Sequence, residues 1–281
     1  MGSSIRDASS QRGDASAVAS RFSMQGRRAL VTGGSVSIGR EIALAFGEAG
    51  ADVAVQYAST ADAAFGKPDA AVATVADIAR NNVRTVAVEA DFAIPGEARR
   101  CVDAARHALG RLDVLVVCAS IQYRTPFLEV PPEQIARQLQ INFLATIELL
   151  QAALPGMKAQ HWGRVLAIGS INQTRPEPDL AVYAALKSAQ HNLVLSLAAD
   201  YAAHGVTVNN LSPGLVATER NRWRRDDAAV WAEIQHNSAP MHRAADPREM
   251  AGAALLLCSE AGSFITGTDL QATVGRHLGW P

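Results

Sequence analysis

Three residues in the second half of the chain have the types and spacing that acid–base chemistry on a carbonyl or an alcohol requires. Tyr183 and Lys187 are four residues apart in a segment of helical character, so both side chains project from one face. Ser170 lies thirteen residues before the tyrosine, at the end of an apolar run that predicts a strand. A phenol with a pKa of about 10 is a weak acid–base group at neutral pH, but a nearby ammonium stabilises the phenolate. A lone Tyr-x-x-x-Lys pair is more often an ordinary helix face, so the other motifs decide its meaning.

A glycine-rich turn near the amino terminus accompanies this group. Residues 32–39 read Thr-Gly-Gly-Ser-Val-Ser-Ile-Gly and lie between a predicted strand and a predicted helix. The free N–H groups and the positive dipole end of a helix N-terminus attract phosphate, and small residues allow a close approach. The alternative is a glycine-rich connection that binds nothing. The candidate cofactor contacts in this turn are Gly33, Ser35, Ser37, Ile38 and Gly39.

The elements that position these residues are short apolar runs, which alternate along the chain with amphipathic segments of helix length. The expected strands are residues 29–32, 52–57, 85–89, 114–118, 163–170, 206–212 and 270–274. The expected helices are residues 38–50, 71–81, 97–109, 132–154, 180–203 and 247–259. Parallel strands need long crossovers and bury both faces, so the alternation predicts an α/β fold with a parallel sheet covered by helices on both sides.

The remaining sequence limits the class of protein. Residues 1–23 lack periodicity and are expected to form a disordered arm before one folded domain over residues 24–281, in which residues 59–69 form a surface loop. The 26 basic and 27 acidic residues leave a net charge of −1, which argues against nucleic-acid or membrane partners. The three cysteines are far apart, and neither they nor the seven histidines have metal-ligand spacing. A cytoplasmic protein without a catalytic metal is expected.

The chain resembles the short-chain dehydrogenase/reductase family over residues 25–278. The turn at residues 32–39, Ser170 and the Tyr183-x-x-x-Lys187 motif carry the resemblance. Supporting segments follow in the family's order: Asp91-Phe92, Asn142 and Pro213-Gly214-Leu215-Val216-Ala217-Thr218. The resemblance implies a single-domain, Rossmann-type doubly wound sheet, with a nicotinamide cofactor across the carboxyl ends of the strands. It also implies a substrate lid at residues 218–240.

The same resemblance implies a role for each matched residue. Ser170 would hydrogen-bond the substrate oxygen, Tyr183 would exchange a proton with it, and Lys187 would stabilise the phenolate and bind the nicotinamide ribose. Asn142 would hold a water for a proton relay, or satisfy backbone groups at a helix bend. The further implied cofactor contacts are Tyr57, Ser59, Asp91, Phe92, Cys118, Ala119, Ser120, Tyr183, Lys187, Pro213, Gly214, Val216 and Thr218. The implied reaction is hydride transfer between nicotinamide and a small carbonyl or secondary alcohol substrate.

Two positions depart from the family's pattern. Ser37 stands where the family has the middle glycine of the turn, which adds a side chain near the pyrophosphate. Val-Cys-Ala-Ser at residues 117–120 replaces the family's Asn-Asn-Ala-Gly, so the groups that brace the fourth strand have changed. Cys118 then lies beside the cofactor. A small apolar role is favoured over a redox role because no basic neighbour in the sequence would produce a thiolate.

Cofactor choice depends on the end of the second strand, where Tyr57 occupies the decisive position. An acid there would bind the ribose hydroxyls of NAD and repel the 2′-phosphate of NADP. The sequence has no acid at this point, Ser59 offers a neutral donor, and Arg40 could add positive charge. Val36, however, occupies a place where NADP-preferring relatives often carry a base. The sequence modestly favours NADP over NAD.

The lid region holds an arginine cluster: Arg220, Arg222, Arg224 and Arg225. The favoured interpretation is a solvated helix face, because Asp226 and Asp227 follow directly and could pair with the arginines. The alternative is recognition of an anionic substrate. Asn172 and Gln173 could hydrogen-bond a hydroxylated substrate or cap their own loop.

Two other functions stay open at this stage: a reductase of 3-oxoacyl thioesters within the same family, and a non-catalytic NAD(P)-binding sensor or scaffold. The two long helices carry more apolar positions than one covered face needs, which favours a homo-oligomer, most simply a tetramer. These positions are Ile135, Leu139, Phe143, Ile147, Leu150, Leu193, Leu195 and Leu197, with Trp280 at the tail.

Overall fold

The computed structural model describes residues 15–238 and 240–279, and its centre is a parallel sheet of seven strands. The strands are β1 (Arg28–Val31), β2 (Asp52–Tyr57), β3 (Thr85–Glu89), β4 (Val114–Val117), β5 (Gly163–Ile168), β6 (Val206–Pro213) and β7 (Asp269–Ala272). Their order is β3-β2-β1-β4-β5-β6-β7, and every neighbouring pair is parallel. The expected α/β fold, a doubly wound Rossmann-type sheet, is confirmed.

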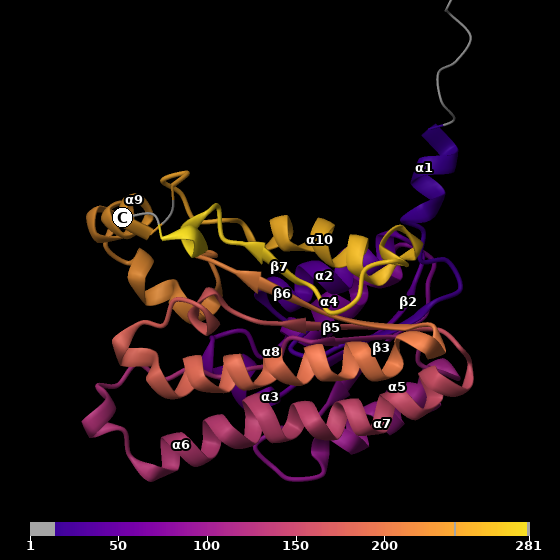
Figure 1. Cartoon of the computed structure of the whole chain (residues 1–281), viewed down its shortest axis with the longest axis horizontal. Helices are drawn as coiled ribbons and strands as arrows, with labels where there is room; N and C mark the ends of the chain where they lie inside the picture. The colour runs from indigo at the N-terminus through magenta and orange to yellow at the C-terminus, as the bar shows by residue number, and fades with distance from the viewer. Residues whose placement is uncertain (1–14, 239, 280–281) are drawn as a thin grey trace, which may run out of the picture.

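Helices cover both faces of the sheet (Figure 1). One layer contains α2 (Ser37–Glu48), α4 (Ala70–Ala79) and α10 (Ala251–Cys258). The other contains α5 (Glu97–Leu109), α6 (Pro132–Leu139), α7 (Ala145–Ala159) and α8 (Ala181–Tyr201). Two further helices, η6 (Glu219–Arg225) and α9 (Ala228–Ser238), follow β6 and lie at the end of the molecule towards which the strands point.

Residues 29–31 of β1 and residues 114–117 of β4 are all apolar because each face of these strands packs against a helix layer. In β1, Leu30 belongs to the core beneath α5, α7 and α8, whereas Ala29 and Val31 belong to the core beneath α2, α4 and α10. Leu115 and Val116 of β4 divide between the two cores in the same way. Alternate residues along each of these strands therefore face two different cores, rather than one core and the solvent.

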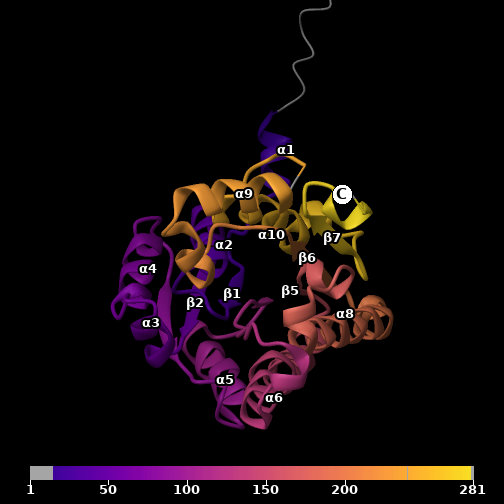
Figure 2. The ribbon, with the colours of Figure 1, turned by 90° about the vertical axis from the view of Figure 1, so that its left-hand side faces the viewer.

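The topology reverses direction at β1, which pairs with β2 on one side and with β4 on the other. In such sheets the crevice at the carboxyl ends of the strands beside this reversal is the usual ligand site. Figure 2 looks onto this end of the molecule, where the connections after β1, β4, β5 and β6 meet inside a ring of helices.

Three expectations about the elements need correction. Within the expected disordered arm, residues 15–21 form α1 (Ala15–Arg21), because alternate alanines give this stretch high helix propensity; residues 1–14 lie outside the described part. The expected surface loop at residues 59–69 begins with a helix, α3 (Ser59–Ala64), whose Asp62 is buried. The expected helix over residues 132–154 is divided by a π-helical turn, η2 (Gln140–Leu144). No helix of the described residues is long and apolar enough to cross a membrane.

Candidate active site

Ser170, Tyr183 and Lys187 come from two adjacent elements and are all buried. Ser170 is the second residue after β5, and Tyr183 and Lys187 lie in the first turns of α8, which packs against β5 and β6. The exposed fractions of the three residues are 8%, 5% and 3%, in that order. The Lys187 Nζ atom lies 5.9 Å from the centre of the Tyr183 ring. The strand end and the helix face thus bring hydroxyl, phenol and ammonium into one region.

The Lys187 ammonium is fixed by two acceptors. Its Nζ atom donates to the carbonyl oxygen of Ile168 at 2.7 Å and to Oε1 of Gln190 at 3.1 Å. Ile168 precedes Ser170 by two residues, so the lysine is attached to the strand that carries the serine. Burial lowers the pKa of Lys187 from its ordinary value, while the nearby Tyr183 acts in the opposite direction. Gln190 was not predicted as a partner of Lys187, although it lies three residues after the lysine on the same helix face.

The loop after Ser170 is held by its own side chains. Ser170 Oγ accepts from the backbone N–H of Asn172 at 3.1 Å, and Gln173 Nε2 donates to Asp269 Oδ2 at 2.6 Å. The Asn172 Oδ1 atom accepts from the backbone N–H of Glu177 at 2.9 Å. Of the two roles left open for Asn172 and Gln173, the structure supports the capping of the loop.

Asn142 lies inside the π-helical turn and is fully buried. Its Oδ1 accepts from the backbone N–H of Ile121 at 2.8 Å, and its Nδ2 donates to the carbonyl oxygen of Ile121 at 2.8 Å. Both polar ends of the side chain thus brace the segment that follows β4. This geometry supports the helix-bend role that the sequence allowed.

The glycine-rich turn leads from β1 into α2 and leaves the helix start open. No side chain caps the N-terminus of α2, so its first N–H groups have no partner from a capping residue. A Cβ on Gly39 would lie 2.1 Å from the carbonyl oxygen of Gly33, so only glycine fits there. Gly33 has a φ of +60°, and its N–H donates to Oε1 of the buried Gln56 at 2.7 Å. Such a small, uncapped helix start suits a phosphate group.

Ser37 adopts a left-handed backbone with a φ of +52°, a region that favours glycine. Its Oγ accepts from the backbone N–H of Glu219, the first residue of η6, at 3.0 Å. The same Glu219 accepts from Lys67 Nζ at 2.7 Å. The serine that departs from the family's pattern therefore links the turn to the proposed lid.

The changed segment after β4 is braced by Thr32. The Thr32 Oγ1 atom accepts from the backbone N–H groups of Cys118 at 2.9 Å and Ala119 at 3.1 Å. Burial raises the pKa of the Cys118 thiol to about 11, which keeps it protonated at neutral pH. The half-buried Cys118 therefore has no thiolate character, in agreement with the favoured apolar role.

The residues expected at the adenosine end lie around the ends of β2 and β3. Tyr57 is half-buried and pairs in register with Glu89. Burial, Glu89 and Asp62, in that order, raise the pKa of Tyr57. Asp62 accepts from Ser35 Oγ at 2.8 Å, and its other oxygen, Oδ2, is buried without a hydrogen bond. This carboxylate was not predicted as a neighbour of the cofactor site, because it comes from α3 rather than from the strand.

The other expected cofactor contacts are placed in several ways. Ser59 is exposed at the start of α3, and Asp91 Oδ1 accepts from the N–H of Ala93 at 2.9 Å. Phe92 packs into the core, which leaves only its backbone for a ligand. Four further expected contacts lie in order from the end of β6 to the start of η6: Pro213, Gly214, Val216 and Thr218.

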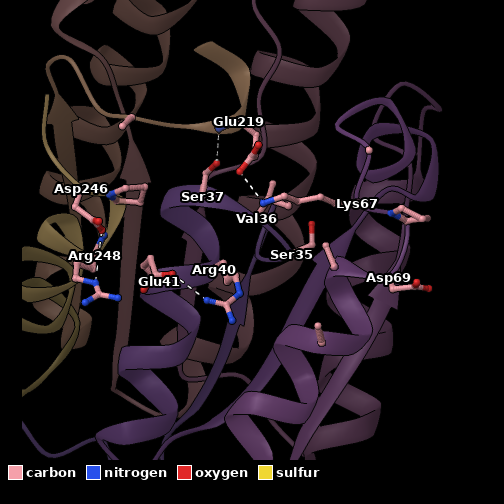
Figure 3. A pocket seen from close by; sticks show the side chains of 16 residues that line it. Ser35, Val36, Ser37, Arg40, Glu41, Lys67, Asp69, Glu219, Asp246 and Arg248 are labelled. Carbon is pink, nitrogen blue, oxygen red and sulfur yellow. Dashed lines mark hydrogen bonds and ion pairs between the residues drawn. The ribbon is translucent and has the colours of Figure 1, made fainter. Parts of the chain in front are cut away.

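A cavity of about 630 Å³ opens beside the phosphate turn (Figure 3). Its wall includes Ser35, Val36 and Ser37 of the turn, together with Lys67 and Glu219. None of the three catalytic candidates lines it. The cavity therefore lies at the glycine-rich turn and apart from the buried cluster of Ser170, Tyr183 and Lys187.

The arginines of the expected lid do not form the expected pairs with Asp226 and Asp227. Asp227 Oδ1 accepts from the N–H groups of Ala229 and Val230, which begins α9, and no ion pair of the described residues joins Asp226 or Asp227 to the arginines. Arg220 instead crosses to the segment after β4, where its Nη2 donates to the carbonyl oxygen of Ser120 at 2.6 Å and to its Oγ at 2.9 Å. The favoured interpretation of a solvated, acid-paired face is therefore wrong for Arg220.

The sequence of the chain is also similar to those of known oxidoreductases. Residues 33–277 match a family described as enoyl-(acyl carrier protein) reductase. An L-rhamnose 1-dehydrogenase (NAD(P)(+)) from Sphingomonas sp. (strain SKA58) is 31% identical over 91% of this chain and 98% of its own. The chain belongs to the short-chain dehydrogenase/reductase family.

Two solved structures show the same fold. A 3-oxoacyl (acyl-carrier-protein) reductase from Agrobacterium tumefaciens C58 with NADP bound is 40% identical, has a TM-score of 0.85, and matches over 92% of this chain and 96% of its own. A gluconate 5-dehydrogenase from Burkholderia cenocepacia J2315 in complex with NADP and tartrate is 29% identical, with a TM-score of 0.84 over 94% and 100% of the chains. The protein is thus an oxidoreductase that transfers hydride between NAD or NADP and a carbonyl or secondary alcohol.

Proposed function

We propose that Ser170, Tyr183 and Lys187 perform this reaction on a small, hydroxylated substrate. One observation carries the assignment: the Lys187 ammonium is held between the Tyr183 ring and the strand end that bears Ser170, in a buried region. An ammonium held in this position acts on the phenol more strongly than it would in water, because the surroundings are of low dielectric.

Each side chain has a separate task. The nicotinamide, when bound, supplies or accepts the hydride. The Ser170 hydroxyl hydrogen-bonds the substrate oxygen, and the Tyr183 phenol gives a proton to that oxygen in reduction or takes one in oxidation. Lys187 places a positive charge beside the Tyr183 ring, and Asn142 keeps the segment after β4 in place through Ile121. The open start of α2 holds the cofactor phosphates.

The substrate class that we propose is a sugar or a sugar acid. The named substrates of the L-rhamnose and gluconate dehydrogenases support it, because both are polyhydroxylated. The second candidate is reduction of a 3-oxoacyl thioester, which the 40% identical reductase favours. A turnover panel of sugars, aldonates and acetoacetyl thioester with each nucleotide separates the two candidates. Absence of turnover with every member would favour the third candidate, a non-catalytic cofactor-binding protein.

The proposal extends to the setting of the site. NADP is the preferred cofactor, in line with the NADP named in both solved relatives, and residues 218–240 form the substrate lid. The protein is cytoplasmic, works as a homotetramer and needs no catalytic metal. The part of the chain that the structure describes has no group of three or more potential metal-ligating side chains.

The Tyr183→Phe variant tests the proposed chemistry. Removal of one hydroxyl should abolish turnover and leave cofactor affinity nearly unchanged, because the phenol oxygen acts on the substrate. Initial rates at matched cofactor saturation provide the measurement. Tyr201→Phe is the control, since Tyr201 ends the same helix far along the chain from the site and should keep wild-type rates. Residual activity above about a tenth in Tyr183→Phe would show that another group moves the proton.

A further inference from the structure

Arg220 of η6 extends from the glycine-rich turn to the segment that follows β4. Its backbone lies at the turn, because the N–H of the preceding Glu219 donates to Ser37 Oγ at 3.0 Å (Figure 3). Its guanidinium lies at the segment after β4, where Nη2 donates to the carbonyl oxygen of Ser120 at 2.6 Å and to Ser120 Oγ at 2.9 Å. Both ends of the arginine are therefore placed by hydrogen bonds.

The two segments that Arg220 joins follow neighbouring strands. Ser37 lies in the turn after β1, Ser120 is the third residue after β4, and β1 pairs with β4 in parallel. The topology of the sheet reverses beside these strands, and the crevice at their carboxyl ends is where such folds bind dinucleotides. The side chain of Arg220 therefore spans the crevice in which the cofactor is expected.

The positive charge of Arg220 has no acidic partner in the part of the chain that the structure describes. No carboxylate of these residues lies within 4.0 Å of its guanidinium. The adjacent acid, Glu219, accepts from Lys67 Nζ at 2.7 Å instead. Burial raises the pKa of the Cys118 thiol, and the positive charges of Lys187 and Arg220 oppose that rise. A half-buried cation without a counter-ion thus lies at the segment after β4.

The guanidinium of Arg220 also has donors that the protein does not use. Ser120 accepts only from Nη2, and among the described residues Nε and Nη1 have no hydrogen-bond partner. Neither atom is among the buried polar atoms that lack a partner, so both are open to solvent. Nε and Nη1 form one edge of the planar group, which can donate to two oxygen atoms side by side. This edge suits an anion with several oxygens.

We propose that Arg220 binds the pyrophosphate of the nicotinamide cofactor, together with the open start of α2. The pyrophosphate is a dianion, whereas the N–H groups of a helix start supply only partial positive charge. Arg220 adds a full positive charge and parallel donors in the same crevice. Ser120 acts as a positioning residue, because its hydroxyl helps to fix the guanidinium. The glycine of the family's pattern at this position has no such hydroxyl.

The substrate is expected in a different place from this anion site. Ser170 and Tyr183 come from the end of β5 and from α8, whereas the arginine is anchored at the segments after β1 and β4. The inference therefore depends on the cofactor that the family uses and not on the proposed substrate.

Nucleotide titrations without substrate test the inference. Arg220→Gln should weaken the binding of NADPH and NADH alike, by about 10-fold, because both nucleotides carry the pyrophosphate. Adenosine 2′,5′-bisphosphate lacks the pyrophosphate, so calorimetry should give it the same Kd with wild type and with Arg220→Gln. Arg220→Lys keeps the charge and should regain part of the affinity. Arg222→Gln is the matched control, because Arg222 is an exposed arginine of the same element.

The same titrations test the positioning role of Ser120. Ser120→Ala should weaken both reduced nucleotides by a smaller factor, about 2-fold to 3-fold, because the carbonyl oxygen still accepts from Nη2. In an Arg220→Gln background the same change should have no further effect, because the serine acts through the arginine. Equal losses in the two backgrounds would show that Ser120 acts independently of Arg220.

The outcomes separate this inference from the proposed function. Unchanged affinities of NADPH and NADH in Arg220→Gln would overturn the pyrophosphate role, and so would an equal loss for adenosine 2′,5′-bisphosphate. A change confined to the KM of the carbonyl or alcohol substrate would assign Arg220 to the substrate instead. The titrations contain no substrate, so their result does not depend on proton transfer by Tyr183. Circular dichroism shows whether Arg220→Gln keeps its fold, and Arg220→Lys tests the charge independently.

Discussion

Tyr57 illustrates how neighbouring charges act on one residue. The phenol stands where an acid would select NAD, but Glu89 on the adjacent strand and Asp62 on α3 both act on it and raise its pKa after burial has done so. Neither acid occupies the position at the end of β2, which is held by Tyr57. Asp62 is turned towards Ser35, which donates to it at 2.8 Å. The local field is therefore already negative, and one further carboxylate should have a clear effect.

Tyr57→Asp should weaken NADP much more than NAD. The new carboxylate would repel the 2′-phosphate in a half-buried site, and a difference of about 10-fold in Kd corresponds to roughly 1.4 kcal/mol. Titration of nicotinamide fluorescence with both reduced nucleotides measures the two affinities. Tyr57→Phe, which adds no charge, should change the two affinities alike. Parallel losses for both nucleotides in Tyr57→Asp would show that this position does not face the 2′ group.

At the scale of elements, the turn after β1 and the first helix after β6 are joined through Ser37. The backbone of Ser37 is in the strained left-handed region, and its Oγ accepts a hydrogen bond from the N–H of Glu219 (Figure 3). The strain costs about 1 kcal/mol and the hydrogen bond contributes about the same, so the two nearly offset each other. The serine therefore has little net effect on stability, and its effect should appear in cofactor retention.

Ser37→Gly and Ser37→Ala together separate these two effects. Glycine removes both the strain and the hydroxyl, so its Tm should stay within about 2–4 °C of wild type, whereas alanine keeps the strain and should be less stable by about 1 kcal/mol. Both variants lack the link to η6, so both should release the cofactor several-fold faster. Stopped-flow displacement of the reduced nucleotide gives the rate. Wild-type release in both variants would refute an anchoring role for Ser37.

The elements also show what the sequence can and cannot predict. The strand at residues 52–57 and the helix at residues 97–109 have the predicted bounds, because their apolar periodicity is clear. The π-helical turn at Asn142 could not be predicted in the same way, since it depends on hydrogen bonds to Ile121 across the fold. Spacing alone singled out the glycine-rich turn and the trio Ser170, Tyr183 and Lys187, and the roles assigned to them stay predictions. Asp62 was not assigned its place, because only a tertiary contact brings it to Ser35.

At the scale of the whole molecule, some of the apolar side chains of the long helices pack into the core and others stay exposed on the outer helix faces. Of the apolar positions expected at an interface, Leu150 is buried in the core, and Leu193 and Leu197 pack against it. The assignment of Leu150 to an interface is therefore wrong, whereas Leu193 and Leu197 are only partly buried within the subunit. Ile135, Leu139 and Leu195 remain 38% to 42% exposed on α6 and α8, which pack against each other along one side of the molecule (Figure 1). Trp280 lies outside the described residues.

These exposed positions predict that the protein is a homotetramer. A self-complementary face on α6 and α8 would cover the same apolar side chains in every subunit under closed symmetry. Light scattering at micromolar concentration should give a mass of about four times the 29.7 kDa of the chain. Leu139→Glu combined with Leu195→Glu should lower that mass, because burial of two carboxylates at an interface is unfavourable. Val72→Glu is the control and should leave the mass unchanged, because Val72 is an exposed side chain of α4 in the other helix layer. A wild-type mass near that of one chain would refute the assembly, and an unchanged mass in the double variant would place the interface on another face.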